Sequence, residues 1–311
     1  MFSTLLGSLP RLPDRPAAAP DAARPGLDDA EARSDALEAR LDDVVALGRV
    51  RLELVSDGAD AAPPDRDAAA IVAAWTAAAG AGAVAVKQVL LGPYSAGRSA
   101  GADPEAIAEV IRPTILALAA AGCLFVEIAE PEALPIATDP LEAAVFARAH
   151  RRLIDGGEGL HASLSLTGGN LDTAGAATFF DLAYQSYAFD LIAGPDNWRL
   201  IAQAPADRGV VCGALGLAPG ADETREVLVW AAHYAASTSG RGLARVGLAN
   251  APTREPLSRS EALRKLAIVA EASRIASVEE PREMATLLDR RAVDPRAGSG
   301  GRFAPARRRR Q

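Results

Sequence analysis

The stretch LFVEIAEPEALPIATDPLEAAVFARAHRRLI, residues 124–154, contains both kinds of unit from which this chain is built. Its first part, Leu124 to Glu130, is a short apolar run, which predicts a buried strand. Its last part, Pro140 to Ile154, has apolar residues at helical spacing, which predicts a helix. The same order recurs eight times along the chain. Eight strand-then-helix units predict a single (β/α)8 barrel, the TIM barrel of the α/β class.

The predicted elements follow one another without a second globular domain. Strands are expected at Thr4 to Leu9, Leu52 to Asp57, Val84 to Leu91, Leu124 to Glu130, His161 to Thr167, Tyr187 to Ile192, Val210 to Leu215 and Leu243 to Asn250. Helices are expected at Asp35 to Leu47, Arg66 to Ala79, Pro104 to Ala121, Pro140 to Ile154, Asp172 to Leu182, Asp196 to Ala204, Glu223 to Ser237 and Arg259 to Ala276, with Asp103, Asp139, Asp222 and Ser258 as N-caps. The barrel should span residues 1–280, and residues 281–311 should form a C-terminal helix and a disordered, arginine-rich tail.

Composition excludes several classes of protein. The chain has 311 residues, of which 49% are hydrophobic and 23% charged, which suits one large buried core. A net charge of -7 argues against general binding to nucleic acid or anionic membranes, because such binding requires clustered basic residues. No apolar run is long enough to span a membrane, so we expect a cytoplasmic protein. Leu12 to Arg33 is expected to be a loop over the barrel mouth.

In a TIM barrel the chemistry takes place where the carboxyl ends of the strands converge. Polar residues on the strands or just after them are therefore the candidates for function. They are Gly7, Ser8, Arg11, Asp57, Lys87, Tyr94, Glu127, Glu130, His161, Ser163, Asn170, Asp190, Asn197 and Asn250.

His161 and Asp190 form the first candidate centre. Strand alternation places His161 and Ser163 on one face, and Asp190 ends an apolar run on the next strand. A buried aspartate needs a partner, and the imidazole one strand away could be that partner in acid-base catalysis or in metal binding. The structural alternatives are a histidine bonded within the barrel, Ser163 as a space-filling residue, and Asp190 as a capping or loop-bonding residue.

Glu130 and Lys87 form the second candidate set. Glu130 ends the fourth strand before Pro131, where barrels often place a catalytic carboxylate. The alternative is a structural bond to a neighbouring amide. A buried lysine can act as a Schiff-base nucleophile, but a charge partner for Glu130 or Glu53 is the interpretation that we favour for Lys87.

Several stretches, taken together, resemble the catalytic barrel of cobalamin-independent methionine synthase. They are Thr4 to Arg11, Ser56-Asp57-Gly58, Leu91-Gly92-Pro93-Tyr94, Phe125 to Pro131, Leu160 to Ser163 and Asp196 to Leu200. The resemblance extends over about residues 1 to 280 and matches a short, single-barrel branch, within the superfamily that also contains uroporphyrinogen decarboxylase. It implies methyl transfer to a thiol such as homocysteine, from a methyl-folate or methyl-corrinoid donor, with a corrinoid or other methyl-carrier protein as a partner.

The resemblance also implies a zinc ion that keeps the thiol deprotonated. The family's ligands are a His-x-Cys pair, a Glu and a Cys, and the corresponding positions here are His161, Ser163, Asp190 and the Asn250–Ala251 region. Only the histidine is unchanged, and serine is a poor zinc ligand because its hydroxyl stays protonated at neutral pH.

The amino-acid pocket that the resemblance implies has changed as well. The family's Asp-Gly-Glu is Asp57-Gly58-Ala59 here, and its Asp-Glu-Pro is Ala129-Glu130-Pro131, so two carboxylates that would hold an ammonium group are missing. The residues that we expect to bind substrate are Gly7, Ser8, Arg11, Asp57, Lys87, Tyr94, Asn197 and Trp198. Those that we expect to act in catalysis are His161, Asp190 and Glu130.

Three functions remain open from the sequence. The first is a methyltransferase with a changed acceptor. The second is a metal-free lyase, in which His161, Asp190 and arginines such as Arg11 and Arg98 handle an acidic substrate. The third is a non-catalytic relic that binds a small ligand. All three place His161 or Asp190 at the barrel mouth.

Overall fold

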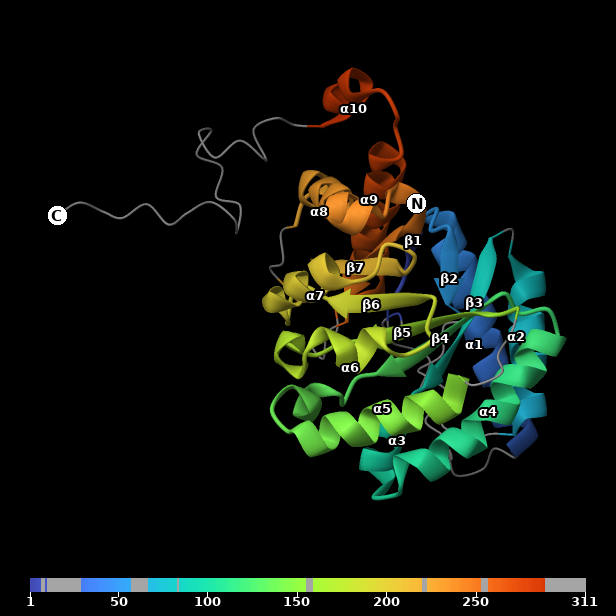
Figure 1. The fold of residues 1–311 in the computed structure, drawn as a ribbon. Coiled ribbons are helices and arrows are strands. Elements are labelled where there is room, and N and C mark those ends of the chain that lie inside the picture. Colours follow the sequence, from blue (N-terminus) through green and yellow to red (C-terminus); the bar gives the residue numbers. More distant parts are fainter. Residues whose placement is uncertain are drawn as a thin grey trace.

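The computed structural model describes residues 1–6, 9, 29–56, 67–82, 84–154, 159–219, 223–252 and 257–288. Within these residues, parallel strands close into one barrel in the order β1 to β8, and the helices surround it (Figure 1). The predicted (β/α)8 fold is therefore confirmed. The strands are β1 Phe2–Thr4, β2 Leu54–Ser56, β3 Ala85–Leu91, β4 Phe125–Glu130, β5 His161–Leu166, β6 Ser186–Asp190, β7 Gly209–Gly216 and β8 Val246–Ala251.

The outer layer is less regular than the sequence predicted. Its α-helices are α1 Asp29–Arg49, α2 Ala68–Ala81, α3 Pro93–Ala100, α4 Pro104–Ala120, α5 Pro140–Ile154, α6 Ala176–Phe180, α7 Trp198–Gln203, α8 Arg225–Ser237, α9 Arg259–Ala276 and α10 Pro281–Leu287. Helix α3 is absent from the elements expected from the sequence; it begins at Pro93, in the first-turn position that proline favours. Helix α1 begins at Asp29, inside the segment expected to be a loop.

Helix starts follow the predicted capping residues where the structure describes them. Asp103 accepts a bond from the amide of Glu105, and Asp139 accepts one from Leu141. Ser258 and Glu261 form a reciprocal capping box at the start of α9. These short side chains satisfy amides that have no partner within the first helical turn.

Strand alternation divides the buried residues between two regions. Residues such as Val55, Val126, Ile128 and Leu164 point outward and belong to the large core between strands and helices. The inward face holds a small apolar cluster of Leu6, Ala188, Val211 and Ala249, with Phe2 packed against it. The rest of the inward face is unusually polar for a barrel, and it defines the site below.

The barrel closes between its first and last strands. Asn250 on β8 accepts a hydrogen bond from the amide of Leu6 through Oδ1 and donates one to the carbonyl of Leu6 through Nδ2, at 3.0 and 2.8 Å. Both residues are buried. Across the described part of the chain, no helix has the length and apolarity needed to cross a membrane.

Candidate functional site in the barrel interior

A buried ion pair lies inside the barrel. Lys87 on β3 donates from Nζ to a carboxylate oxygen of Glu127 on β4, and also to the carbonyl of Leu5, at 2.7 Å, where β1 ends. Lys87 is 0% exposed and Glu127 is 2% exposed. Within the described chain, two of the three ammonium hydrogens thus have acceptors. Lys87 thus connects the end of β1 to β4 across the barrel interior.

Three buried hydroxyl groups on the strands of the barrel have no hydrogen-bond partner among the described residues. They belong to Thr4, Ser56 and Ser163. Ser56 lies beside Lys87 in the β2–β3 register, and Ser163 lies beside Glu127 in the β4–β5 register. Thr4 pairs with Leu54 one inward position lower. Buried polar groups are rarely left unpaired, so these hydroxyls indicate a place where water or a ligand completes the structure.

The predicted partner of Lys87, Glu130 or Glu53, is wrong. Glu130 points out of the barrel, and Glu53 binds Ser3 and Ser273 instead. Glu127 is the partner because it shares the inward face with Val89 and Ser163 in the parallel register. The signal was available in the sequence, since alternation on the fourth strand separates Glu127 from Glu130.

His161 lies at the amino-terminal end of the barrel, not at its mouth. It begins β5, stacks on Phe125 with ring centroids 4.4 Å apart, and its Nε2 lies 2.8 Å from the hydroxyl of Ser186. Burial lowers its pKa below the ordinary value. The ring of Phe2 contacts Phe125 in turn, so Phe2, Phe125 and His161 form a cluster of rings at this end of the barrel.

Asp190 lies at the opposite end, where β6 reaches the mouth. Its carboxylate accepts bonds from the amides of Ile192 and Ala193, both at 2.9 Å, and from Gly168 at 3.3 Å. Ser186, the partner of His161, precedes Asp190 by four residues, which is roughly 13 Å along a strand. The prediction that His161 and Asp190 meet is wrong, because strand β5 begins rather than ends with the histidine.

The proposed zinc ligands do not converge for the same reason. His161 is at one end of the barrel, Ser163 carries only a hydroxyl in the interior, and Asp190 is engaged by amides at the other end. Among the residues placed by the structure, no three His, Cys, Asp or Glu side chains are grouped closely enough to hold a metal ion. These residues do not fit zinc. Among the described members of the lyase set, His161 and Asp190 lie at opposite ends of the barrel, and Arg98 lies over the Tyr94 ring in the helical layer.

Glu130 supports the start of α3 instead of lining the mouth. Its two carboxylate oxygens accept the amides of Tyr94, at 3.0 Å, and Ser95, at 2.6 Å. His150 Nε2 lies 3.0 Å from Glu130, and His150 Nδ1 lies 2.6 Å from the hydroxyl of Tyr184. All of these groups are buried between the strands and the outer helices. Glu130 therefore points away from the barrel interior, and the catalytic position expected for it is wrong.

The aromatic residues expected to bind substrate also face the outer layer. Tyr94 donates to Glu142 at 2.6 Å and packs against Phe146, and burial raises its pKa above the ordinary value. Trp198 packs against Trp230 and Tyr234 of α8. Both side chains therefore pack among helices rather than over the mouth.

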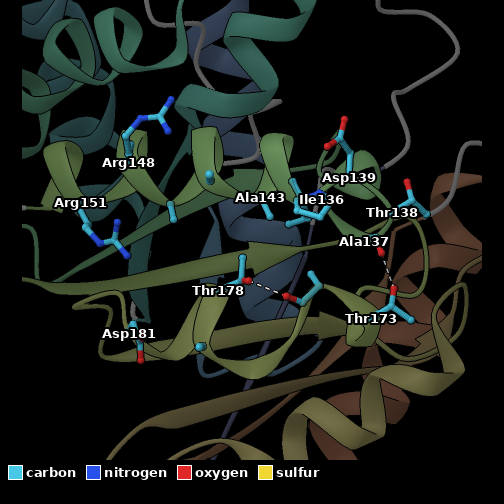
Figure 2. Close-up of a pocket in the computed structure, with 15 residues that line it drawn as sticks. Ile136, Ala137, Thr138, Asp139, Ala143, Arg148, Arg151, Thr173, Thr178 and Asp181 are labelled. Carbon is cyan, nitrogen blue, oxygen red and sulfur yellow. Dashed lines mark hydrogen bonds between the residues drawn. The ribbon is translucent and has the colours of Figure 1, made fainter.

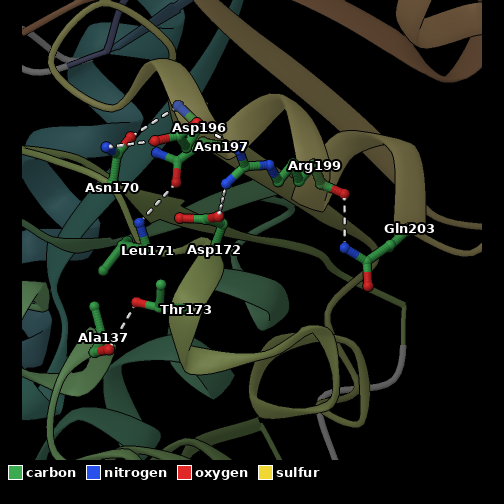
Figure 3. A network of polar contacts seen from close by, with 9 residues as sticks. All are labelled: Ala137, Asn170, Leu171, Asp172, Thr173, Asp196, Asn197, Arg199 and Gln203. Carbon is green, nitrogen blue, oxygen red and sulfur yellow. Dashed lines mark hydrogen bonds and ion pairs between the residues drawn. The ribbon is translucent and has the colours of Figure 1, made fainter.

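Asn197 orders the loops that follow β5 and β6. Its side chain accepts the amide of Leu171 and donates to the carbonyls of Gly169 and Asp190. Figure 3 shows it beside the reciprocal pair of Asn170 and Asp196. Both polar side-chain atoms of Asn197 are used in this way, which identifies a structural role. Gly7, Ser8, Arg11 and Asp57 lie outside the described residues.

A separate groove of about 610 Å³ lies on the outside of the barrel, between α5 and α6 (Figure 2). It forms because α6 has only five residues and leaves α5 partly uncovered. Alanines form much of its lining, with Arg148 and Arg151 toward one end. None of the residues predicted from sequence to act in a site lines it.

The fold defines the class as a TIM barrel, and solved structures similar to it include methionine synthases and a homocysteine methyltransferase. No protein-family model matches the chain, and no curated protein matches it in sequence. A B12-independent methionine synthase from Shewanella sp. W3-18-1, solved with selenomethionine, is similar with a TM-score of 0.72 at 14% identity, over 92% of this chain and 99% of that one.

Two further structures extend this similarity. A putative vitamin-B12-independent methionine synthase from Listeria monocytogenes has a TM-score of 0.67 at 15% identity, over 90% of this chain and 98% of that one. A homocysteine methyltransferase from Escherichia coli has a TM-score of 0.50 at 14% identity, over 88% and 96% of the two chains. At these identities the likeness shows the shared fold.

Proposed function

We propose that this protein is a methyltransferase that methylates a small thiol bound in the barrel interior, beneath the carboxyl-terminal mouth. The observation that carries the proposal is the polar interior around Lys87 and Glu127, with its three unpaired hydroxyls. A barrel interior normally holds bulky apolar side chains, so a polar patch there is better explained by a ligand than by packing. The structural likeness to methionine synthases supports methyl transfer as the chemistry.

The acceptor proposed here differs from an amino acid. The interior carboxylate of Glu127 is engaged by Lys87, and Asp190 is engaged by backbone amides. Neither is left to receive an ammonium group, and Ala129 stands on the inward face where the family resemblance implies a carboxylate. A thiol without an amino group is therefore the expected acceptor.

The reaction can be tested with the full chain and two classes of methyl donor, a methyl-folate and methylcobalamin. The acceptors are 2-mercaptoethanol, 3-mercaptopropionate, cysteamine and homocysteine, and the product is the methyl thioether, measured by mass spectrometry. We expect turnover with at least one donor and weaker turnover with homocysteine than with 2-mercaptoethanol. Absence of product from every combination, with folded protein, would overturn the proposal.

A methyl-carrier protein or corrinoid partner becomes the expected donor if only methylcobalamin supports turnover.

The double variant Lys87→Met/Glu127→Gln tests whether the interior pair is the reaction site, because it removes both charges of the pair together. It should remain folded and lose turnover. Unchanged turnover in the double variant would place the reaction elsewhere.

A further inference from the structure

We infer that Glu127 and Lys87 activate the thiol without a metal, by exchanging a proton inside the barrel. This inference rests on the proposed function, because it concerns how the same acceptor becomes nucleophilic. A thiol attacks a methyl group as its thiolate, and the described residues offer no zinc site to form one. They do offer a carboxylate and an ammonium group in contact, both shielded from solvent.

The proton exchange keeps the charge of the interior constant. Before it, the Glu127 carboxylate balances the Lys87 ammonium. The thiol proton then passes to Glu127, and the thiolate replaces the carboxylate as the counter-ion of Lys87. The summed charge is zero in both states, so no unpaired charge is left in a buried site. Loss of the proton to solvent would leave one negative charge in excess, which burial strongly disfavours.

The unpaired hydroxyls supply the remaining hydrogen bonds. Ser56 lies beside Lys87, and Ser163 lies beside Glu127, so a sulfur atom that binds against this pair has a hydroxyl donor beside each charged group. The third ammonium hydrogen of Lys87, which has no acceptor in the described structure, is available to the same sulfur. An anion held by several donors inside a protein is more stable than one held by a single charge.

The methyl transfer that follows is balanced. The thiolate sulfur forms a bond to the methyl carbon, and the bond from that carbon to the donor atom breaks with its electron pair remaining on the donor. The proton held by Glu127 then passes to the demethylated donor or to solvent. Glu127 is thus the base of the first step and the acid of the last, and Lys87 is the counter-ion throughout.

The decisive experiment measures proton release when 2-mercaptoethanol binds, with no methyl donor present. Calorimetry in two buffers of different ionisation enthalpy counts protons, and the ultraviolet absorbance of the bound thiolate reports ionisation. We expect thiolate to form with no proton released, and we expect a zinc chelator to change neither result. One proton released per thiol bound, as metal coordination requires, or no thiolate at all would overturn the inference.

Variants separate the two roles. Glu127→Gln should bind the thiol without ionising it, and Ser163→Ala should lower the thiolate fraction by about tenfold, because it removes one hydrogen bond to an anion. If Glu127→Gln alone fails to fold, the folded double variant Lys87→Met/Glu127→Gln serves in its place. Arg151→Ala, in the external groove, is the control and should match the wild type. A full thiolate signal in the Glu127 variants would contradict the inference.

The inference and the proposed function fail separately. Thiolate formation with a retained proton, followed by no methyl product from either donor, would support the proton exchange and overturn the methyltransferase. Methyl transfer that proceeds undiminished in Glu127→Gln would support the methyltransferase and overturn the proton exchange.

Discussion

Gly92 lies directly against the carboxylate of Glu130: a Cβ atom at residue 92 would fall 2.1 Å from Glu130 Oε1. If the carboxylate moved away from such a Cβ atom, it would lose its hydrogen bonds to the amides of Tyr94 and Ser95. Gly92→Ala should therefore lower the free energy of unfolding by roughly 2–4 kcal/mol, combining overpacking with weakened hydrogen bonds. Urea unfolding followed by circular dichroism measures this change.

Gly80 provides the matched control for that substitution. It lies in α2, and a Cβ there would meet nothing within 4 Å. Gly80→Ala should stabilise the protein by about 0.5–1 kcal/mol, because alanine loses less backbone entropy in a helix. Equal effects of the two substitutions would show that Glu130 does not hold α3 in the way the structure indicates.

His161 should make stability depend on pH. Burial lowers its pKa in the folded state, so the unfolded chain binds more protons as the pH falls through the ordinary histidine value of about 6.5. The stability contributed by neutral His161 is present above that pH and is lost as the pH falls toward the folded-state pKa. His161→Phe should flatten this part of the stability curve, measured by urea titrations between pH 5 and about 8. An unchanged slope would assign the effect to other groups.

Asp190 should contribute to stability rather than to proton transfer. Its carboxylate accepts three backbone amides from the loops after β5 and β6. Asp190→Asn replaces one acceptor oxygen by a donor and removes the charge, which should cost about 1.5–3 kcal/mol. The measurement is chemical denaturation, paired with turnover at a temperature where both proteins are folded. Lost turnover in a fully stable variant would restore a catalytic role.

Lys87 and Glu127 should be strongly coupled. Lys87→Met alone leaves a buried carboxylate without its partner and should cost about 3–5 kcal/mol. The double variant with Glu127→Gln should recover most of that loss, because it removes both charges. A double-mutant cycle on unfolding free energies measures the coupling, and additive effects would mean that the pair is not buried as a unit.

The fold could be predicted from the sequence because its signal repeats eight times. An error of a few residues at one strand, such as β1 ending at Thr4 rather than Leu9, does not change the order of elements. A site has no such redundancy. Placing His161 at the mouth requires the residue to lie at the carboxyl end of β5. The predicted strand, His161 to Thr167, already begins with the histidine, so its own bounds place the residue at the opposite end.

The other site residues were misplaced because the face of the strand on which each side chain lies was not used. Glu127 and Glu130 lie three apart on one strand and therefore on opposite faces, so one enters the barrel and the other supports α3. No sequence motif marks Thr4 and Ser56 as site residues, because serine and threonine are common in strands. The pairing of neighbouring strands places Ser56 beside Lys87 and Thr4 beside Leu54.

The contact between Leu6 and Asn250 joins positions 244 residues apart. The ring cannot close until almost the whole polypeptide is available, so closure carries one of the largest loop entropies in the molecule and should come late in folding. Removing the Asn250 side chain is then expected to accelerate unfolding more than it slows folding. Kinetic resistance to opening would thus depend on the amide side chain of Asn250 as well as on the backbone pairing of β1 with β8.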